Sequence, residues 1–361
     1  MSNNLSSFAA RLREYIQSSE SHAGAFDVLA LELFALQFQH NTAYRKICES
    51  RHLTPSTGKH WAQIPAVPTS LFKELELTSL APAERTAVFH SSGTTEQKPS
   101  RHFHNADSLA VYETSLWQGF KTHFDTTSQL ICLTPPPAQA PHSSLIHMFE
   151  VVRHHFGAPP SAFLGQIDPD GTWTLDYSAV LTVLTPSRLA PRASLLLGTA
   201  FSFVHLLDHL VENNLHFELP AGSRVMETGG YKNRSRTMPK SELHALITAR
   251  LGIPRENIIC EYGMSELSSQ AYDAEIHPPS STLHPRCLHF PPWARVQIIS
   301  PETGREVTEG ATGLIRIFDL ANIFSVAAIQ TEDLGIRRGD GFELIGRAQL
   351  AEPRGCSLMT A

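Results

Sequence analysis

The 361-residue sequence lacks the patterns that mark several common classes of protein. It contains no basic run interleaved with aromatic residues, and 29 basic against 35 acidic residues give a formal charge of −6 at pH 7. This charge balance argues against nucleic acid as the main partner. With 42% apolar and 18% charged residues, the composition also excludes disorder, collagen and a coiled coil, and it allows a sizeable core.

Signals for secretion and for membrane insertion are also missing. The first residues, MSNNLSSFAARLREYIQ, do not have the charged and then apolar order of a secretory signal. The most apolar stretch, residues 193–210, contains His205, Asp208 and His209, so we expect no membrane span there. The five cysteines form no CxxC pair and are odd in number, which favours a reducing cytoplasm over a disulfide scaffold. We therefore expect a soluble cytoplasmic protein.

Several catalytic patterns are absent as well. The 19 histidines include no HExxH pattern and no tight carboxylate–histidine spacing, so core or surface positions explain them more simply than a metal site does. Ser91, Ser92 and Ser265 lack the GxSxG context of a hydrolase nucleophile. No GxxxxGK[ST] loop is present, which excludes a Walker A phosphate site.

What is present is a change of periodicity along the chain. Apolar residues recur at helical spacing from Leu5 to Ile16, and residues 26–38 read as a denser apolar helix. We expect residues 1–80 to form a helical N-terminal segment that packs on the core. After the HPPSSTLHPR loop, short strands are separated by Gly and Asp turns, so we expect residues 286–361 to form a β-rich, largely antiparallel subdomain with a flexible tail.

Strands and helices alternate between these two segments, over residues 81–285. A helix is predicted over about residues 106–124, followed by the strand QLICLT, the helix SSLIHMFEVVRHHF, the strand SLLLGT and the helix AFSFVHLLDHLVENN. SRVMET, PKSELHALITARLG and ENIICEYG continue the alternation. This order predicts parallel strands with crossover helices, and hence an α/β core.

Two motifs in this core could bind a nucleotide. In HSSGTTEQKPS, residues 90–100, small hydroxyl residues and a glycine let backbone N–H groups approach a polyphosphate, and Lys98 adds charge. EYGMSE, residues 261–266, directly follows an apolar strand, and acidic groups at the carboxyl end of a parallel strand suit a ligand or Mg²⁺. Each motif alone is explained as simply by a solvated turn or by an ordinary exit from a strand.

Two more motifs lie in the C-terminal segment. In TEDLG, residues 331–335, Asp333 follows the strand SVAAIQ, and a carboxylate at a strand end can accept two hydrogen bonds from a ribose diol. A capping aspartate in a turn is the alternative. Gly346 and Arg347 follow, and an exposed arginine after a strand is their simpler interpretation.

Together the four motifs resemble those of the adenylate-forming superfamily, which comprises acyl-CoA synthetases, peptide-synthetase adenylation domains and firefly-type luciferases. They occur in the order of that superfamily, with separations of about 170, 70 and 15 residues. FHSSGTTEQKPSRHFHN, ETGGYK, EYGMSELSSQAY and the terminal RGCSL resemble, more specifically, the LuxE-type acyl-protein synthetases. This resemblance covers roughly residues 60–361.

The resemblance implies a fold, and the sequence departs from the family pattern at a few positions. It implies an α/β protein with a large adenylate-forming core of mixed and parallel sheets flanked by helices, followed by the β-rich subdomain. Only about 15 residues follow Arg347, so no full C-terminal lid domain is expected. Glu96 and Glu332 stand where the superfamily usually has glycine, and Gln349 stands where many relatives have a charged hinge residue.

The resemblance also implies which residues contact ATP. They are Ser91, Ser92, Gly93, Thr94, Thr95, Lys98, Gly229, Gly230, Tyr262, Asp333 and Arg347. The loop from Ser91 to Lys98 would hold the phosphates, and the two glycines would line the adenine pocket, on which Tyr262 packs. Asp333 would hold the ribose, and Arg347 would sit near the phosphate or the ribose. Glu266 would bind Mg²⁺.

Two catalytic questions concern lysine and cysteine. The superfamily's late lid lysine has no counterpart, so either Lys98 or Lys232 assists the first step or adenylation is slow. By resemblance, Cys356 in the RGCSL tail is the acyl acceptor, and Arg354 could favour its thiolate. An idle thiol on a frayed tail is the alternative. Cys132 and Cys260 lie inside apolar strands and are expected to be buried structural residues.

The resemblance thus implies an ATP-dependent, AMP-forming acid–thiol ligase. A carboxylic acid, expected to be a fatty acid, would become acyl-AMP, pass to Cys356 as a thioester and be delivered to a partner acyl reductase. Two alternatives are a phenylacetate-type ligase that uses coenzyme A, in which Cys356 is idle, and a non-catalytic subunit that binds a partner reductase.

Overall fold

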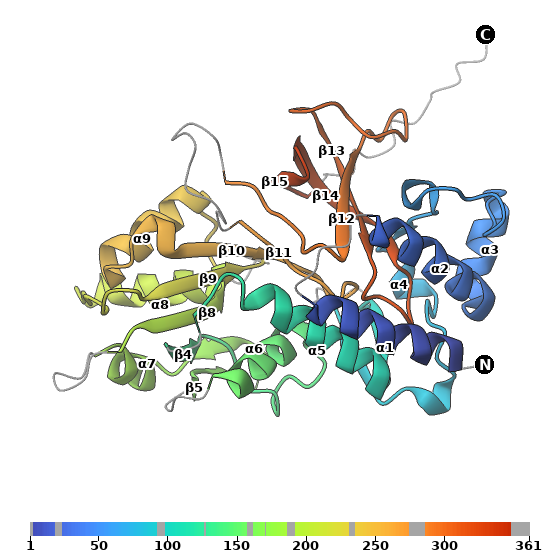
Figure 1. The fold of residues 1–361 in the computed structure, drawn as a ribbon. Helices are drawn as coiled ribbons and strands as arrows, with labels where there is room; N and C mark the ends of the chain where they lie inside the picture. The colour runs from blue at the N-terminus through green and yellow to red at the C-terminus, as the bar shows by residue number, and fades with distance from the viewer. Residues whose placement is uncertain are drawn as a thin grey trace, which may run out of the picture.

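A computed structural model describes residues 3–18, 24–91, 98–125, 128–156, 162–169, 171–185, 192–230, 235–273 and 286–347. Within these ranges the chain forms two large sheets and a set of helices around them (Figure 1). The predicted α/β fold class is confirmed. In the same ranges, none of the helices combines the length and the apolar composition that a membrane crossing requires.

The N-terminal segment is helical, as predicted. It contains α1 (Asn3–Gln17), α2 (Ala25–His40), α3 (Thr42–Ser50), α4 (Leu71–Glu74) and the short 3-10 helix η1 (Trp61–Gln63), and a second 3-10 helix, η2 (Pro82–Glu84), follows it. Phe8 and Leu12 of α1 are fully buried, and α1 lies along α5 (Ala106–Phe120), where Ser6 donates a hydrogen bond of 2.5 Å to Asp107 (Figure 1). The predicted division at residues 80 and 285 stays a prediction.

The core sheet has six strands in the order β11-β10-β9-β8-β4-β5. These are β4 (Gln129–Cys132), β5 (Ala162–Phe163), β8 (Ser194–Thr199), β9 (Arg224–Thr228), β10 (Ile258–Tyr262) and β11 (Ala271–Tyr272). All neighbouring pairs are parallel except β10 and β11, which are antiparallel. The predicted alternation of strands and crossover helices is therefore confirmed.

Helices cover both faces of this sheet because side chains alternate along each strand. Leu196, Val225 and Ile258 pack with α7 (Tyr177–Leu184), α8 (Ala200–Glu212) and α9 (Lys240–Leu251). Leu197 and Met226 point to the other face and pack with α5 and α6 (Ser144–His155). The predicted helix over residues 106–124 ends at residue 120, and α7 was not predicted.

The C-terminal sheet is antiparallel, as predicted. It contains β12 (Ala294–Ile299), β13 (Thr312–Asp319), β14 (Ala328–Arg338) and β15 (Gly341–Arg347), with β15 pairing with β14. The short strand β1 (Val67–Pro68) pairs in parallel with the beginning of β14, on the same edge that β15 pairs with farther along. Two hairpins lie outside both sheets: β2 (Ala87–His90) with β3 (Arg101–His104), and β6 (Gly165–Ile167) with β7 (Trp173–Leu175).

A fully buried carboxylate fastens the C-terminal sheet to the loop that follows β10. Asp319, the last residue of β13, accepts hydrogen bonds from the Ser269 hydroxyl at 2.7 Å and from the backbone N–H groups of Ser268 and Ala321 at 2.9 Å each. Burial raises the pKa of Asp319, and these hydrogen bonds oppose the rise. The buried carboxylate therefore stabilises the fold only while it accepts all three hydrogen bonds.

Replacing Asp319 with alanine should destabilise the protein strongly. Asp319→Ala leaves one hydroxyl and two N–H groups buried without an acceptor, so we expect a loss of about 3 kcal/mol or more in the free energy of unfolding. Urea denaturation measures this. Asp340→Ala is the matched control, since the Asp340 side chain is 95% exposed and forms an ion pair with His289 at 3.4 Å. Equal losses in the two variants would contradict the role given to Asp319.

Candidate active site

The first and second sequence motifs lie against each other. Ser91 follows β2, and its hydroxyl accepts a hydrogen bond of 3.0 Å from the N–H of Ser100. The Ser100 hydroxyl lies 3.4 Å from that of Ser265, which in turn donates to Glu266 at 3.0 Å. His102 in β3 also contacts this loop, with its Nδ1 2.9 Å from the carbonyl oxygen of Ser265. The β2–β3 hairpin thus positions the first motif beside the second.

Part of the first motif lies outside the described residues. Ser92, Gly93, Thr94 and Thr95 are among these, so their predicted contacts with phosphate stay predictions. Lys98 is described and exposed beside this segment.

Glu266 is a buried carboxylate without a cationic partner in the part of the chain that the structure describes. It is 6% exposed, and its backbone carbonyl accepts a hydrogen bond of 2.8 Å from Asn322. Nearby His102 adds no charge, because burial lowers its pKa to about 4. A buried carboxylate needs a compensating charge, and oxygen ligands suit Mg²⁺. The residues present therefore fit the predicted metal role of Glu266.

Tyr262, Asp333 and Arg347 come together from three strands. The Tyr262 hydroxyl donates a hydrogen bond of 2.9 Å to Asp333, and Nε of Arg347 lies 3.7 Å from the other carboxylate oxygen. Burial raises the pKa of Asp333, while the Tyr262 hydrogen bond and the Arg347 charge lower it. The Arg347 side chain is 83% exposed, so its guanidinium can reach a bound anion. The second, third and fourth motifs therefore meet at one carboxylate.

The predicted position of Asp333 at the end of a strand is wrong. The strand predicted from SVAAIQ continues as β14 to Arg338, so Asp333 lies inside it, directly opposite Arg347 in β15. The reason is the hairpin between β14 and β15, whose pairing extends the strand beyond the apolar residues. The register shifts between Leu334 and Gly335, next to Asp333.

Gly229 and Gly230 leave the core sheet beside Tyr262. They follow Thr228, the last residue of β9, which is the register partner of Glu261 in β10. Gly229 has a φ of +66°, which favours glycine, and a Cβ placed on either glycine would meet nothing within 4 Å. Open space at the end of the strand that pairs with β10, which Tyr262 ends, fits the predicted adenine pocket.

Glu261 is a buried acid to which the sequence assigned no separate role. It is 8% exposed and accepts a hydrogen bond from the Thr228 hydroxyl, on the face of the sheet that α5 covers. Burial raises its pKa to about 7, against the Thr228 hydrogen bond, and the charge of Glu227 raises it further. A Cβ at Gly263 would lie under 3.0 Å from Oε1 of Glu261, so a larger residue there would require the Glu261 carboxylate to move.

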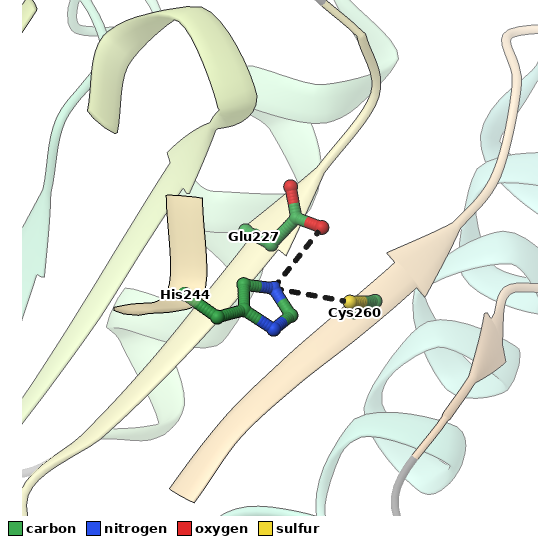
Figure 2. Close-up of side chains that lie close together, drawn as sticks. All are labelled: Glu227, His244 and Cys260. Atoms are coloured by element: carbon green, nitrogen blue, oxygen red, sulfur yellow. Dashed lines mark hydrogen bonds and ion pairs between the residues drawn. The ribbon is translucent and has the colours of Figure 1, made fainter. Parts of the chain in front are cut away.

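A second polar group lies on the opposite face of the same two strands. Figure 2 shows Glu227 of β9, His244 of α9 and Cys260 of β10 turned toward one another. Cys132 and Cys260 are buried, as predicted, but Cys260 belongs to this polar group and not to a purely apolar core. Sequence analysis missed the group because its members come from three separate elements.

Glu261 should make stability depend on pH. Its pKa is about 7 in the folded protein and near 4.5 when it is unfolded, so unfolding releases a proton between these values. The contribution of Glu261 to the free energy of unfolding is therefore complete below about pH 4.5 and is lost as the pH rises through 7. At about 1.4 kcal/mol per pKa unit, the loss is about 3 kcal/mol. Glu261→Gln removes this fall.

Urea denaturation near pH 5 and near pH 8 tests this prediction. From pH 5 to pH 8, the free energy of unfolding of the wild type should fall by about 3 kcal/mol more than that of Glu261→Gln. Glu74→Gln, which alters an exposed carboxyl group of α4, should leave the difference unchanged. Parallel pH profiles for the wild type and Glu261→Gln would show that the carboxyl is ionised at both pH values.

Comparisons with known proteins agree with the motifs. A model of the acyl-protein synthetase family LuxE matches residues 6–361. The long-chain-fatty-acid–luciferin-component ligase of Aliivibrio fischeri is 25% identical over 351 residues, which are 93% of this chain and 87% of that protein. The ligase of the same name from Vibrio harveyi is 23% identical over 340 residues, 90% of this chain and 84% of that one.

Solved structures share the fold. An open conformation of 2-hydroxyisobutyryl-CoA ligase matches 88% of this chain and 73% of its own with a TM-score of 0.66 at 13% identity. The same enzyme in its thioesterification state gives a TM-score of 0.65 at 14% identity, over 90% of this chain and 67% of its own. The predicted adenylate-forming fold is confirmed. Because the family model spans nearly the whole sequence, the chain belongs to the LuxE acyl-protein synthetase family, which makes it a ligase.

Proposed function

We propose that the chain activates a long-chain fatty acid with ATP and then transfers the acyl group to its own Cys356. The convergence of three motifs carries this proposal, because Tyr262 at the end of β10 and Arg347 of β15 both contact the carboxylate of Asp333. The substrate class rests on the two curated relatives, whose names specify long-chain fatty acids. The cysteine usage favours action in a reducing cytoplasm.

The proposed nucleotide site has two parts, of which the first would bind the adenine and the ribose. Asp333 would accept hydrogen bonds from the ribose hydroxyls, and the open space at Gly229 and Gly230 would take the adenine beside Tyr262. Arg347 is exposed enough to contact the α-phosphate or the ribose. The loop from Gly263 to Ser265 connects this part to Glu266.

Glu266 and the first motif would serve the phosphates. Glu266 would hold Mg²⁺, which neutralises phosphate charge when bound. The Ser91 hydroxyl, at the start of the first motif, lies 3.0 Å from the backbone nitrogen of Ser100, and the Ser100 hydroxyl contacts that of Ser265 beside Glu266. Backbone N–H groups of the first motif and Lys98 would therefore reach the same phosphates as the ion at Glu266. We propose Lys98 as the cation that assists adenylation, with Lys232 as the alternative.

The first step exchanges a poor leaving group for a good one. An oxygen of the fatty-acid carboxylate attacks the α-phosphorus of ATP, and the bond from that phosphorus to pyrophosphate breaks. The products are acyl-AMP and pyrophosphate. Positive groups around the phosphates stabilise the charge that builds up on the leaving pyrophosphate.

The second step forms a thioester. The Cys356 thiolate attacks the carbonyl carbon of acyl-AMP, and the bond to the phosphate oxygen breaks, so AMP leaves with the electron pair. Cys356 lies outside the described residues, and its role rests on the RGCSL motif. A partner acyl reductase would then take the acyl group from the thioester.

A second candidate is an acyl-CoA ligase. It is favoured by the fold shared with a CoA ligase whose structure contains both an acyl-AMP and coenzyme A. In this case coenzyme A attacks the acyl-AMP, and Cys356 stays idle.

Self-acylation should depend on Cys356. After incubation with MgATP and a panel of carboxylic acids, intact-protein mass spectrometry should show the mass of one acyl group on the wild type but not on Cys356→Ala. Both should release pyrophosphate, because adenylation does not need the thiol. Cys287→Ala, which removes a partly buried thiol, is the control and should be acylated.

Other results would change the proposal. Pyrophosphate without an adduct, followed by acyl-CoA when coenzyme A is added, would favour the CoA ligase. Neither pyrophosphate nor adduct with any acid of a broad panel would favour a non-catalytic subunit.

Glu266→Gln should slow adenylation. Removing the charge that would hold Mg²⁺ should lower the rate of fatty-acid-dependent pyrophosphate release by about 100-fold or more. Glu49→Gln, at an exposed position of α3, should keep the wild-type rate. Unfolding curves of both variants check that the fold survives, and a folded Glu266→Gln variant with the wild-type rate would refute the metal role.

A further inference from the structure

The Glu227–His244–Cys260 cluster lies apart from the proposed nucleotide contacts. Glu227 and Cys260 point to the α9 face of the core sheet, whereas their neighbours Thr228 and Glu261 point to the α5 face. Nε2 of His244 lies 3.8 Å from Oε1 of Glu227 and 3.8 Å from Sγ of Cys260 (Figure 2). All three ligand atoms lie within 4.8 Å of one another.

These atoms are a donor set for a thiophilic metal ion. A thiolate, an imidazole nitrogen and a carboxylate oxygen are the ligands of tetrahedral Zn²⁺, with bonds of about 2.0–2.3 Å. Tetrahedral angles between such bonds separate the donor atoms by about 3.4–3.6 Å. The two separations that involve Nε2 of His244, 3.8 Å each, are therefore a few tenths of an ångström wider than those around a bound ion, and the Glu227 and Cys260 ligand atoms lie within 4.8 Å of each other.

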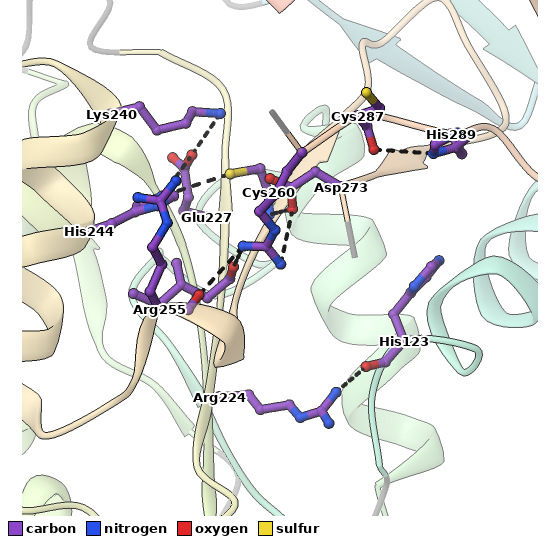
Figure 3. A network of polar contacts seen from close by, with 12 residues as sticks. His123, Arg224, Glu227, Lys240, His244, Arg255, Cys260, Asp273, Cys287 and His289 are labelled. Carbon is purple, nitrogen blue, oxygen red and sulfur yellow. Dashed lines mark hydrogen bonds and ion pairs between the residues drawn. The ribbon is translucent and has the colours of Figure 1, made fainter. Parts of the chain in front are cut away.

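The cluster already binds a cation, the side chain of Lys240. Its Nζ lies 3.1 Å from Oε1 of Glu227, the same oxygen that His244 faces (Figure 3). The Lys240 side chain is 52% exposed, whereas Glu227 is 2% exposed. Lys240 can therefore leave toward solvent and make room for an ion, while the three ligands stay in place.

An ion pair between Lys240 and Glu227 does not explain the other two members. A buried carboxylate needs a cation and hydrogen bonds, and Lys240 supplies the cation. His244 and Cys260 also hydrogen-bond to Glu227. The ion pair alone does not require that a buried imidazole and a buried thiol both face this carboxylate. His244 is 3% exposed, and its Nδ1 has no hydrogen-bond partner among the described residues. The polar contacts of the ring are therefore those of Nε2 with Glu227 and Cys260.

The neighbouring groups fix the position of Cys260. Its backbone N–H donates a hydrogen bond of 2.6 Å to Asp273, and Arg286 lies 3.9 Å from the same carboxylate oxygen. Figure 3 shows Asp273 beside Cys260, with Lys240 and His244 around Glu227. Asp273 is therefore engaged by a backbone donor and an arginine, which leaves Cys260, His244 and Glu227 as the metal ligands.

We infer that Glu227, His244 and Cys260 form a binding site for one divalent cation of the zinc type, and that Lys240 occupies this site when the ion is absent. On binding, the Cys260 thiol loses its proton to solvent and the Lys240 ammonium moves from Glu227 into water. The ion would link β9 to β10 one residue before Thr228 and Glu261. This site does not involve Glu266, and it stands whether or not the proposed reaction occurs.

Cobalt titration tests this site, since a Co²⁺–thiolate bond gives a charge-transfer band in the near ultraviolet. The reduced, chelator-treated full-length protein should bind one equivalent of Co²⁺ with this band, and Zn²⁺ should abolish it. Cys260→Ala should lose the band, whereas Cys287→Ala and Cys356→Ala should keep it. Lys240→Met removes the competing ammonium, so Co²⁺ should bind about tenfold more tightly.

Opposite outcomes would overturn the inference. One is no thiolate band in the wild type, and another is a band that survives in Cys260→Ala but disappears in Cys356→Ala. Should Cys260→Ala fail to fold, the Lys240→Met variant decides, because its substitution lies at a half-exposed position. Unchanged or weaker Co²⁺ binding by that variant would show that Lys240 and the ion do not compete for one site.

Discussion

The geometry of the candidate active site depends on the buried carboxylate of Asp319. It holds the backbone of Ser268 and the hydroxyl of Ser269, two and three residues after Glu266. Asn322 adds a hydrogen bond of 2.8 Å to the carbonyl oxygen of Glu266. Because a buried ionised carboxylate is tolerated only when its hydrogen bonds are complete, this loop has little freedom to move relative to the C-terminal sheet.

The N-terminal helices contribute to the same restraint. Gln37 of α2 donates a hydrogen bond of 2.7 Å to the carbonyl of Asn322 and accepts one of 3.0 Å from the N–H of Ala327. A helix that carries none of the family motifs is thus connected to Glu266 through Asn322. This connection gives the first segment of the chain a physical role, although its sequence alone predicted only that it is helical and packs on the core.

The motifs were predictable from sequence because each is local. The order of strands and helices and the antiparallel C-terminal sheet follow from patterns within short windows, whereas the roles of Tyr262 and Arg347 came only from the resemblance. Asp333 was placed wrongly because apolar alternation stops at Gln330, while pairing with β15 continues the strand. The Glu227 cluster could not be predicted because its members come from β9, β10 and α9, and sheet register and helix packing bring them together.

The two faces of β9 and β10 carry buried acids in different protonation states, Glu261 on the α5 face and Glu227 on the α9 face. On the α5 face, Glu261 has a neutral donor, Thr228, and burial keeps it protonated up to about pH 7. On the α9 face, burial would raise the pKa of Glu227, but the hydrogen bond with His244 and the charge of Lys240, 3.1 Å away, lower it to about 2, so Glu227 stays ionised. A buried acid next to a cation can exchange that cation for another, whereas a metal ion at Glu261 would first have to displace its proton. The arrangement of charge therefore favours a metal ion on the α9 face over one at the carboxyl of Glu261.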